Sequence, residues 1–493
     1  MKIKKEQATT IALVALTFAF FMVFYTRIHP IVIFDTDCWH YAYYDRHPWP
    51  IWGNWNPTRV FPEIMMPLVT QFGAFVIYPL SGDFFVSLTI GYAIAVSAVI
   101  AALTLVVIRH FQRQGSGCFD TIVLALFFLI NHFLVLRSAK SGNQYMFSTV
   151  NACTYFYYVI PNLMNCILVI WLMDDPSLHY FFANNHHIRK AACLLLGYFC
   201  MFSNLWSSIV TVSYGGIVLL SDLIGTLKER KHGRSVIDWL RKNAILFILL
   251  ALWGLAQVFE YHGGRANSLK GNPLPARLME TLTMLEDVLK TVSLPFLITS
   301  AVLIVLGVCT ILRKKNVASV RFHIISLASG AVIAAYLLLS CAIAGPGYIS
   351  RADVIYGVFF FIMLVLMTAL KDILRYLPWS KIMLPLVLII LLAECNTADK
   401  TFLEATISQT PPEVCYQVDN DILQQLRDGE AAGKAKIKLQ VPLYSGDNWP
   451  LATYGKDFFP KLLYKSGVLS TRIRVKEMVP TEKKNEQFHI KVD

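Results

Sequence analysis

The sequence predicts an all-α bundle that crosses a membrane about eleven times and ends in a small α+β domain. Of its 493 residues, 56% are hydrophobic and only 15% are charged, and the mean hydropathy is +0.52. Soluble domains carry about a quarter charged residues, so this composition excludes an ordinary soluble enzyme. Apolar runs long enough to cross a hydrocarbon layer of about 30 Å recur along most of the chain.

These apolar runs place the membrane spans. We expect spans near 10–27, 84–108, 119–136, 155–173, 191–205, 207–224, 243–257, 292–312, 322–343, 353–370 and 382–394. The run 61–80 is also apolar, but a crossing there would leave Arg109 and Arg113 on the outer side, against the positive-inside tendency. We therefore expect 61–80 to form an interfacial or re-entrant helix on the outer face.

The basic residues set the orientation of the bundle. The net charge is +12, yet the tail after residue 394 is nearly neutral, with 14 basic and 13 acidic residues. The basic residues gather instead between spans, most densely at 228–242 and 313–315. Such loops are typically cytoplasmic, which predicts a cytoplasmic N-terminus and an outer C-terminus and gives no reason to expect a nucleic-acid partner. The first span lacks a small-residue cleavage site, so we expect it to remain as a signal anchor.

The chain divides into a membrane module, 1–394, with a first outer loop at 28–83, and a C-terminal outer domain, 395–493. In that domain, Asp419 to Lys434 is expected to be helical, and "KIKLQVPLY" and "STRIRVKEMV" alternate with the period of a strand. Most of the ten cysteines lie in apolar spans as small hydrophobic residues. Cys395 and Cys415 fall on the outer side, where they could pair or stay unpaired.

The first outer loop, "FDTDCWHYAYYDRHPWPIWGNWNPTRVFPE", combines carboxylates with aromatic rings. Sugar sites use both, because hydroxyls need acceptors and the C–H face of a pyranose needs a flat partner. The aromatic residues by themselves could equally form a belt at the membrane interface, where Trp and Tyr are enriched. Asp35 and Asp37, two residues apart beside a membrane exit, are harder to explain in that way, since carboxylates there are costly to desolvate.

Cations on the outer side could complete the site. We expect Arg59, Arg137, Lys140 and Arg351 to face outward, where two or three of them could surround a lipid phosphate. Alternatively, each of these cations could contact lipid headgroups instead of a bound substrate. Transfer of a sugar from a polyprenyl phosphate needs one carboxylate to deprotonate the acceptor and cations to stabilise the leaving phosphate. A glycoside hydrolase needs two carboxylates that flank the bond, which fits this pattern less well.

In its overall plan the chain resembles the GT-C membrane glycosyltransferases. That plan consists of a first span, an Asp-x-Asp motif in the first outer loop, many further spans and an outer tail. Within this group the chain is most similar to the bacterial glucosyltransferases of O-antigen serotype conversion, through "DTDCWHY", "WNPTRVFPE", "SNLWSS" and "VPLYSGDNWPLATYGKDF". The resemblance implies Asp37 or Asp35 as the catalytic base and Arg59 as a contact to the donor phosphate. It also implies Asn204 and Trp449 in the site, although "SNLWSS" lacks the acidic residue that many relatives carry in this turn.

The resulting expectation is an inverting hexosyltransferase in a bacterial inner membrane, with glucose as the expected sugar and with its C-terminus in the periplasm. Its expected partners are a polyprenyl-phosphate sugar, a polysaccharide acceptor such as O-antigen and the lipid bilayer, and they could include a flippase and a donor-making synthase. We expect no metal and no cofactor. The residues expected to contact sugar or acceptor are Trp39, His40, Tyr41, Trp55, Asn56, Asn204, Trp206, Trp449 and Tyr454.

Two other functions remain open at this level. A polysaccharide-repeat polymerase would typically carry its large outer loop in mid-chain rather than at the end. A lipid or sugar transporter coupled to ions would bury ionisable residues at mid-membrane. The predicted spans hold His132 and His323 near their ends and no Asp, Glu, Lys or Arg in their interiors, which disfavours ion coupling.

Overall fold

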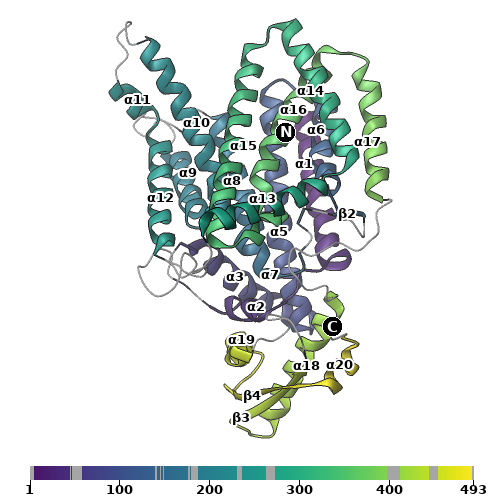
Figure 1. The fold of residues 1–493 in the computed structure, drawn as a ribbon. Helices are drawn as coiled ribbons and strands as arrows, with labels where there is room; N and C mark the ends of the chain where they lie inside the picture. The colour runs from purple at the N-terminus through teal and green to yellow at the C-terminus, as the bar shows by residue number, and fades with distance from the viewer. Residues whose placement is uncertain are drawn as a thin grey trace.

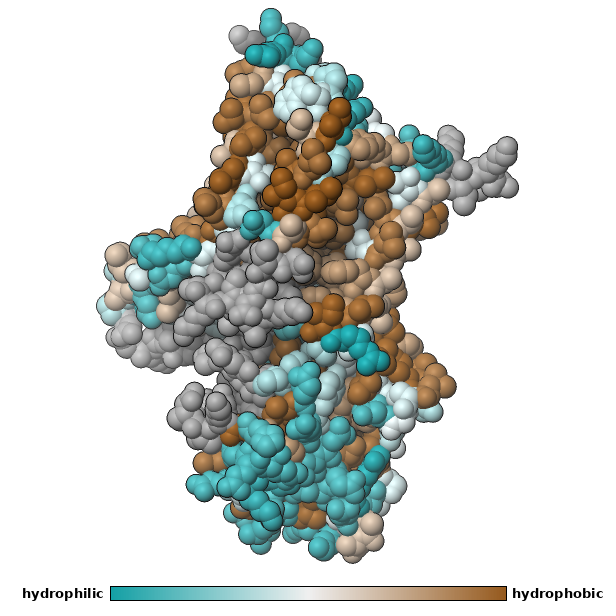
Figure 2. All heavy atoms as spheres, turned by 90° about the vertical axis from the view of Figure 1, so that its right-hand side faces the viewer, coloured by the Kyte–Doolittle hydropathy of each residue, from teal (hydrophilic) through white to brown (hydrophobic). Residues whose placement is uncertain are grey.

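The structure is a computed structural model that describes residues 5–44, 46, 58–138, 142–144, 146–147, 149–175, 178, 187–229, 236–262, 273–396, 411–443 and 453–490. Helices packed side by side form its larger part, and a small domain lies at one end of them (Figure 1). We call this the domain end of the bundle, and the opposite end the far end. In Figure 2, hydrophobic residues cover the side of the bundle, whereas hydrophilic residues gather over the domain and at the far tip.

Nine helical stretches of the described residues are long and apolar enough to cross a membrane. Eight of them coincide with predicted spans, and the ninth is Val60–Ser81. The three other predicted spans are also helical but shorter: α6 (Cys118–Leu134), α9 (His187–Met201) and α17 (Ser380–Asn396). The chain is therefore a helical, multi-pass membrane protein. The helices of the other eight predicted spans are α1 (Lys5–Val23), α5 (Phe84–Arg113), α8 (Ile160–Asp174), α10 (Leu205–Glu229), α12 (Ala244–Tyr261), α14 (Leu294–Lys314), α15 (Val317–Ala344) and α16 (Ala352–Tyr376).

The segment between α1 and α5 begins and ends at the domain end, because these two helices lie antiparallel. Gln112 donates to Thr10 Oγ1 (2.9 Å) near the far end, and Thr89 donates to the Ile31 carbonyl (2.6 Å) near the domain end. Within this segment α3 (Val60–Phe72), the π-helical turn Gly73–Ile77 and α4 (Tyr78–Ser81) form one helical run. The run begins at α3, which Figure 1 labels at the domain end, and its last residues lead into α5. Its placement as an interfacial or re-entrant helix stays a prediction, because its length and hydropathy also fit a membrane span.

Two short helices at the domain end begin next to each other. α2 (Thr36–Tyr41) belongs to the first predicted outer loop, and α7 (Ala152–Thr154) continues through the π-helical turn Tyr155–Val159 into α8. The Val32 amide donates to the Val150 carbonyl (2.9 Å), and the Ala152 amide donates back to the Val32 carbonyl (3.1 Å). These two backbone bonds hold the chain entering α2 against the chain entering α7.

Four elements of the bundle, at both of its ends, were not predicted. A two-stranded antiparallel hairpin, β1 (Leu136–Ser138) and β2 (Gly142–Gln144), follows α6. α13 (Leu274–Lys290) packs against α15 and against the 3-10 turn Pro346–Ser350 that precedes α16. α11 (Val236–Lys242) lies at the far end between α10 and α12 (Figure 1).

The C-terminal domain contains the helix and both strands that the sequence predicts. β3 (Lys436–Pro442) pairs in parallel with β4 (Arg474–Thr481), and α18 (Pro412–Ala431) packs against β3. The other elements are the 3-10 turn Thr453–Asp457, α19 (Phe458–Lys465) and α20 (Glu482–Phe488). The domain rests on the bundle through polar bonds, from Arg427 to the Tyr78 hydroxyl (2.9 Å) and from Lys465 to the Tyr43 carbonyl (2.9 Å).

Candidate functional site

A cavity of about 250 Å³ lies at the domain end of the bundle. Four segments that are far apart in the sequence line it: the residues before α3, the turn between α9 and α10, the end of α12 and the end of α15. Three residues predicted for the site are among the lining residues, namely Arg59, Asn204 and Trp206. The full lining is Thr58, Arg59, Ser203, Asn204, Leu205, Trp206, Gln257, Glu260, Tyr261, Tyr336, Leu339, Ser340, Ile343 and Ala344.

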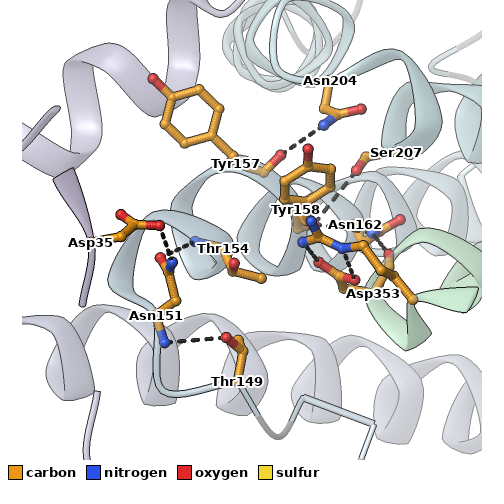
Figure 3. Close-up of polar contacts among 11 residues, drawn as sticks. Asp35, Thr149, Asn151, Thr154, Tyr157, Tyr158, Asn162, Asn204, Ser207 and Asp353 are labelled. Carbon is orange, nitrogen blue, oxygen red and sulfur yellow. Dashed lines mark hydrogen bonds and ion pairs between the residues drawn. The ribbon is translucent and has the colours of Figure 1, made fainter. Parts of the chain in front are cut away.

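Asn204 closes the turn between α9 and α10 with both ends of its side-chain amide. Its Oδ1 accepts from the Trp206 amide (2.9 Å), and its Nδ2 donates to the Tyr157 carbonyl (3.0 Å). In a regular helix the Tyr157 carbonyl would accept from the amide four residues on, but that residue is Pro161, which has no N–H. Asn204 therefore satisfies a carbonyl that the sequence leaves without its helical donor (Figure 3).

Trp206 joins the cavity to a group of tyrosines. Its indole N–H donates to Ser340 Oγ (2.9 Å), and its ring stacks on Tyr158 with centroids 6.1 Å apart and planes 22° apart. The ring of Tyr348, from the 3-10 turn Pro346–Ser350, also packs against Trp206, with the two centroids 4.6 Å apart. The indole is 6% exposed, so the aromatic neighbours fix its orientation.

Arg59 lies over an aromatic ring at the edge of the same cavity. Its guanidinium carbon is 5.4 Å from the centroid of Tyr157, and the Tyr41 ring of α2 packs against Tyr157 at 5.0 Å. Beside it, Thr58 donates to Glu260 Oε2 (3.3 Å). The cation is thus held among tyrosines, which support a positive charge through their ring faces.

Glu63 and Arg46 form a buried ion pair next to these tyrosines, with Nη1 and Oε2 3.0 Å apart. Glu63 is 3% exposed, and the Tyr157 hydroxyl donates to its other oxygen (3.4 Å). Neither residue was predicted for the site. Glu63 ends the motif "WNPTRVFPE" and is the first acidic residue of an otherwise apolar helix, and that position was the available signal.

The two carboxylates of the Asp-x-Asp motif differ in their surroundings. Asp35 caps α2: its Oδ1 accepts from the Cys38 amide (2.9 Å), and its Oδ2 accepts from Asn151 Nδ2 (2.8 Å; Figure 3). Burial, helped by the negative charge of Asp37, raises the pKa of Asp35 to about 6. Asp37 lies in the first turn of α2 and is exposed. Of the two, Asp37 is the carboxylate that a substrate can reach.

Arg351 does not line the cavity. Its Nε and Nη2 donate to the two oxygens of Asp353 (3.1 and 2.6 Å), and its guanidinium lies 4.2 Å from the centroid of Tyr158. Asn162 in turn donates to the Asp353 carbonyl (2.6 Å; Figure 3). Because Tyr158 also stacks on Trp206, which lines the cavity, the rings of Tyr158 and Trp206 separate Arg351 from the cavity.

The predicted aromatic contacts on α2 have different surroundings. Trp39 is 1% exposed and packs between Phe85 (5.5 Å) and Phe459 of the C-terminal domain (4.7 Å), so it forms part of an interdomain contact rather than an open sugar platform. His40 is partly buried against Phe458 (4.5 Å between centroids), and burial together with the charge of Lys461 lowers its pKa to about 4. Burial raises the pKa of Tyr41 to about 12.

The remaining predicted site residues are less fully described. Trp55, Asn56, Lys140 and Trp449 lie outside the described residues. Arg137 belongs to β1, and Tyr454 belongs to the turn Thr453–Asp457. Their roles stay predictions.

One group of described residues offers donor atoms suited to a metal ion. A carboxylate oxygen of Asp35 and the sulfur atoms of Cys38 and Cys153 all lie within 4.8 Å of one another. The sequence analysis expected no metal, and that expectation stays a prediction.

Comparison of the chain with models of protein families, with curated proteins and with solved structures gives no match. Its function is therefore inferred from the residues and from the geometry of the domain end.

Proposed function

We propose that this chain is an inverting membrane glycosyltransferase of the GT-C type, with eleven crossings. It would move a hexose from a polyprenyl phosphate to a polysaccharide acceptor on the outer side of a bacterial inner membrane, with the domain end facing outward. The observation that carries the proposal is the meeting of Arg59, Asn204 and Trp206 at one cavity, at the end of the bundle where α2 exposes Asp37.

The lining of the cavity suits an amphiphilic donor. Arg59, Asn204 and Glu260 supply polar groups, whereas Leu339 and Ile343 of α15 supply apolar surface. These two apolar side chains are 49% and 39% exposed, so the lining continues onto the outer surface of the bundle. A prenyl chain could remain in the bilayer against α15 while its phosphate reaches the guanidinium of Arg59.

The carboxylate of Asp37 is suited to the acceptor. The hydroxyl of Tyr41 is within electrostatic reach of Arg59, Glu63 and Asp37, so the exposed carboxylate and the cavity cation belong to one neighbourhood. Asp35 is the less accessible base, because its two oxygens already accept bonds from Cys38 and Asn151, whereas Asp37 is exposed.

The proposed reaction is a single displacement. The acceptor hydroxyl attacks the anomeric carbon, the bond from that carbon to the phosphate oxygen breaks, and the hydroxyl proton passes to Asp37. Arg59 stabilises the negative charge that develops on the leaving polyprenyl phosphate. Attack from the face opposite the phosphate inverts the anomeric centre.

The test is mass spectrometry of surface polysaccharide from cells that express the intact chain, Asp37→Asn or Asp83→Asn. Asp83 is a matched control in the same outer segment: it caps α5 by accepting from the Val86 amide (3.0 Å), and Asn caps a helix equally well. We expect an added hexose with the intact chain and with Asp83→Asn, and a loss of about 10²–10⁴-fold in rate with Asp37→Asn, as for removal of a general base.

Two outcomes would contradict the proposal in different ways. Full activity of Asp37→Asn would remove this residue from the role of base. Movement of a labelled sugar lipid between leaflets without any hexose added to polysaccharide would instead assign the chain to transport, and elongated polysaccharide with an unchanged repeat mass would assign it to polymerisation.

A further inference from the structure

Two cysteines meet beside the Asp-x-Asp motif. Cys38 belongs to α2 and Cys153 to α7, and their sulfur atoms lie within 4.8 Å of each other. The backbone amide of Cys153 donates to the sulfur of Cys38 (3.4 Å) across 115 positions of sequence. Both side chains are buried, at 0% and 9% exposure. This contact joins the helix that carries Asp37 to the helical run that leads to Tyr157.

The fold holds these two thiols together through Asn151. Asn151 caps α7 by accepting from the Thr154 amide (3.2 Å), and the same Oδ1 accepts from the thiol of Cys38 (3.2 Å). Its Nδ2 donates to Asp35, the cap of α2. One amide side chain thus aligns the first turns of both helices, and each first turn presents a cysteine to the other.

We propose that Cys38 and Cys153 form a disulfide bond that ties α2 to α7. The inference rests on the proposed outward placement of the domain end, because disulfides persist in oxidising compartments and not in the reducing cytosol. It does not rest on sugar transfer.

The oxidation needs a disulfide-bearing oxidant of that compartment, either an oxidoreductase or a small-molecule disulfide. Its disulfide is attacked by one thiolate to form a mixed disulfide, and the second thiolate then displaces the oxidant. One sulfur–sulfur bond forms in the chain, two S–H bonds are lost, and the two electrons and two protons reduce the oxidant to two thiols. Because both sulfurs are buried in the folded chain, the reaction takes place as α2 docks on α7.

A metal ion is the competing use of the same atoms. It would need both sulfurs as thiolates, and it would need an oxygen of Asp35, whose two oxygens already accept from Cys38 and Asn151. A disulfide uses only the two sulfurs. It removes the bond from the Cys38 thiol to Asn151, but it leaves the backbone bonds that cap α2 and α7 in place and asks nothing further of Asp35.

The experiment uses the intact chain, isolated from membranes without reductant, denatured in the presence of an alkylating reagent, and digested for mass spectrometry. We expect a cross-linked pair of peptides that contain Cys38 and Cys153, lighter by two hydrogen atoms than the two peptides together. After reduction, both cysteines should carry the alkyl group. Cys166 and Cys200, which are buried in α8 and α9, serve as matched controls and should be alkylated without reduction.

Alkylation of both Cys38 and Cys153 without reduction would overturn the inference. So would a stoichiometric metal that is released only with a chelator, because the sulfurs would then be ligands. A Cys38→Ala variant, in which Cys153 becomes alkylatable, checks that the pairing is specific. A disulfide in a chain without transferase activity would leave this inference standing and refute the proposed function, and free thiols in an active transferase would do the reverse.

Discussion

The ion pair of Arg351 and Asp353 allows a prediction that separates structural from functional roles. The carboxylate is 2% exposed and the guanidinium 16%, and two bonds join them. Removing one partner of a buried pair typically costs about 3–5 kcal/mol, because the other charge stays buried without compensation. Since this guanidinium is partly exposed, we expect Arg351→Gln to lower the free energy of unfolding by about 3 kcal/mol, the lower end of that range.

The double variant Arg351→Gln/Asp353→Asn should be more stable than this single variant. Two neutral amides of similar size can still share a hydrogen bond, so the double change should cost about 1 kcal/mol. The assay is the midpoint of thermal or denaturant unfolding in detergent, followed by tryptophan fluorescence, for the intact chain and the variants. A double variant as unstable as Arg351→Gln would refute the reasoning, because the cost could then not come from an uncompensated Asp353.

The same variants test the predicted contact of Arg351 with the donor phosphate. If this residue acts only by holding Asp353, transfer should recover with stability in the double variant. If it also supports the donor through Tyr158 and Trp206, the double variant should be stable but show a raised KM for the polyprenyl-phosphate sugar.

Two further predictions concern α2. A Cβ at Gly455 would overlap Cγ2 of Thr36, so Gly455→Ala should loosen the contact between the C-terminal domain and α2, at a cost of about 1–3 kcal/mol. Addition of Thr36→Ala should restore the unfolding midpoint, and a failure of this rescue would argue that the two residues do not meet. The pKa of Asp35 is about 6 in the folded state, against an ordinary value of 3.8. At a pH between these two values, Asp35 is therefore mostly protonated in the folded state and mostly ionised in the unfolded state. Stability should therefore fall by up to about 3 kcal/mol as pH rises from about 4 to 6 and then level off. Asp35→Asn should remove this fall, and an unchanged pH profile would show that another group causes it.

Local patterns in the sequence predicted most of the helices correctly. All eleven apolar runs are helical, because length and hydrophobicity are properties of a run by itself. Whether Val60–Ser81 crosses the bundle depends on where its two ends meet the rest of the chain, which no local pattern gives. α13 was not predicted although its apolar residues have helical spacing, because charged residues among them keep the segment from forming an apolar run.

The candidate site could be predicted only in part. Arg59, Asn204 and Trp206 meet at one cavity, as their motifs suggested. The sugar platform assigned to Trp39 shows the limit of that reasoning, because an aromatic residue in an acidic loop reveals nothing of the Phe459 that covers it from more than 400 positions away. Arg46 was missed for a similar reason, since it becomes notable only through its ion pair with Glu63.

The π-helical turn Tyr155–Val159 explains how these distant residues reach one place. Pro161 removes the helical donor for the Tyr157 carbonyl, and Asn204 supplies one from the turn between α9 and α10. The adjacent tyrosines then contact different parts of the site: Tyr157 lies under Arg59 and donates to Glu63, whereas Tyr158 lies under Arg351 and stacks on Trp206. Wide π turns of this kind are frequent at functional sites. Pro161 in "YVIPN" therefore follows the turn whose two adjacent tyrosines hold Arg59 and Arg351, one guanidinium over each ring.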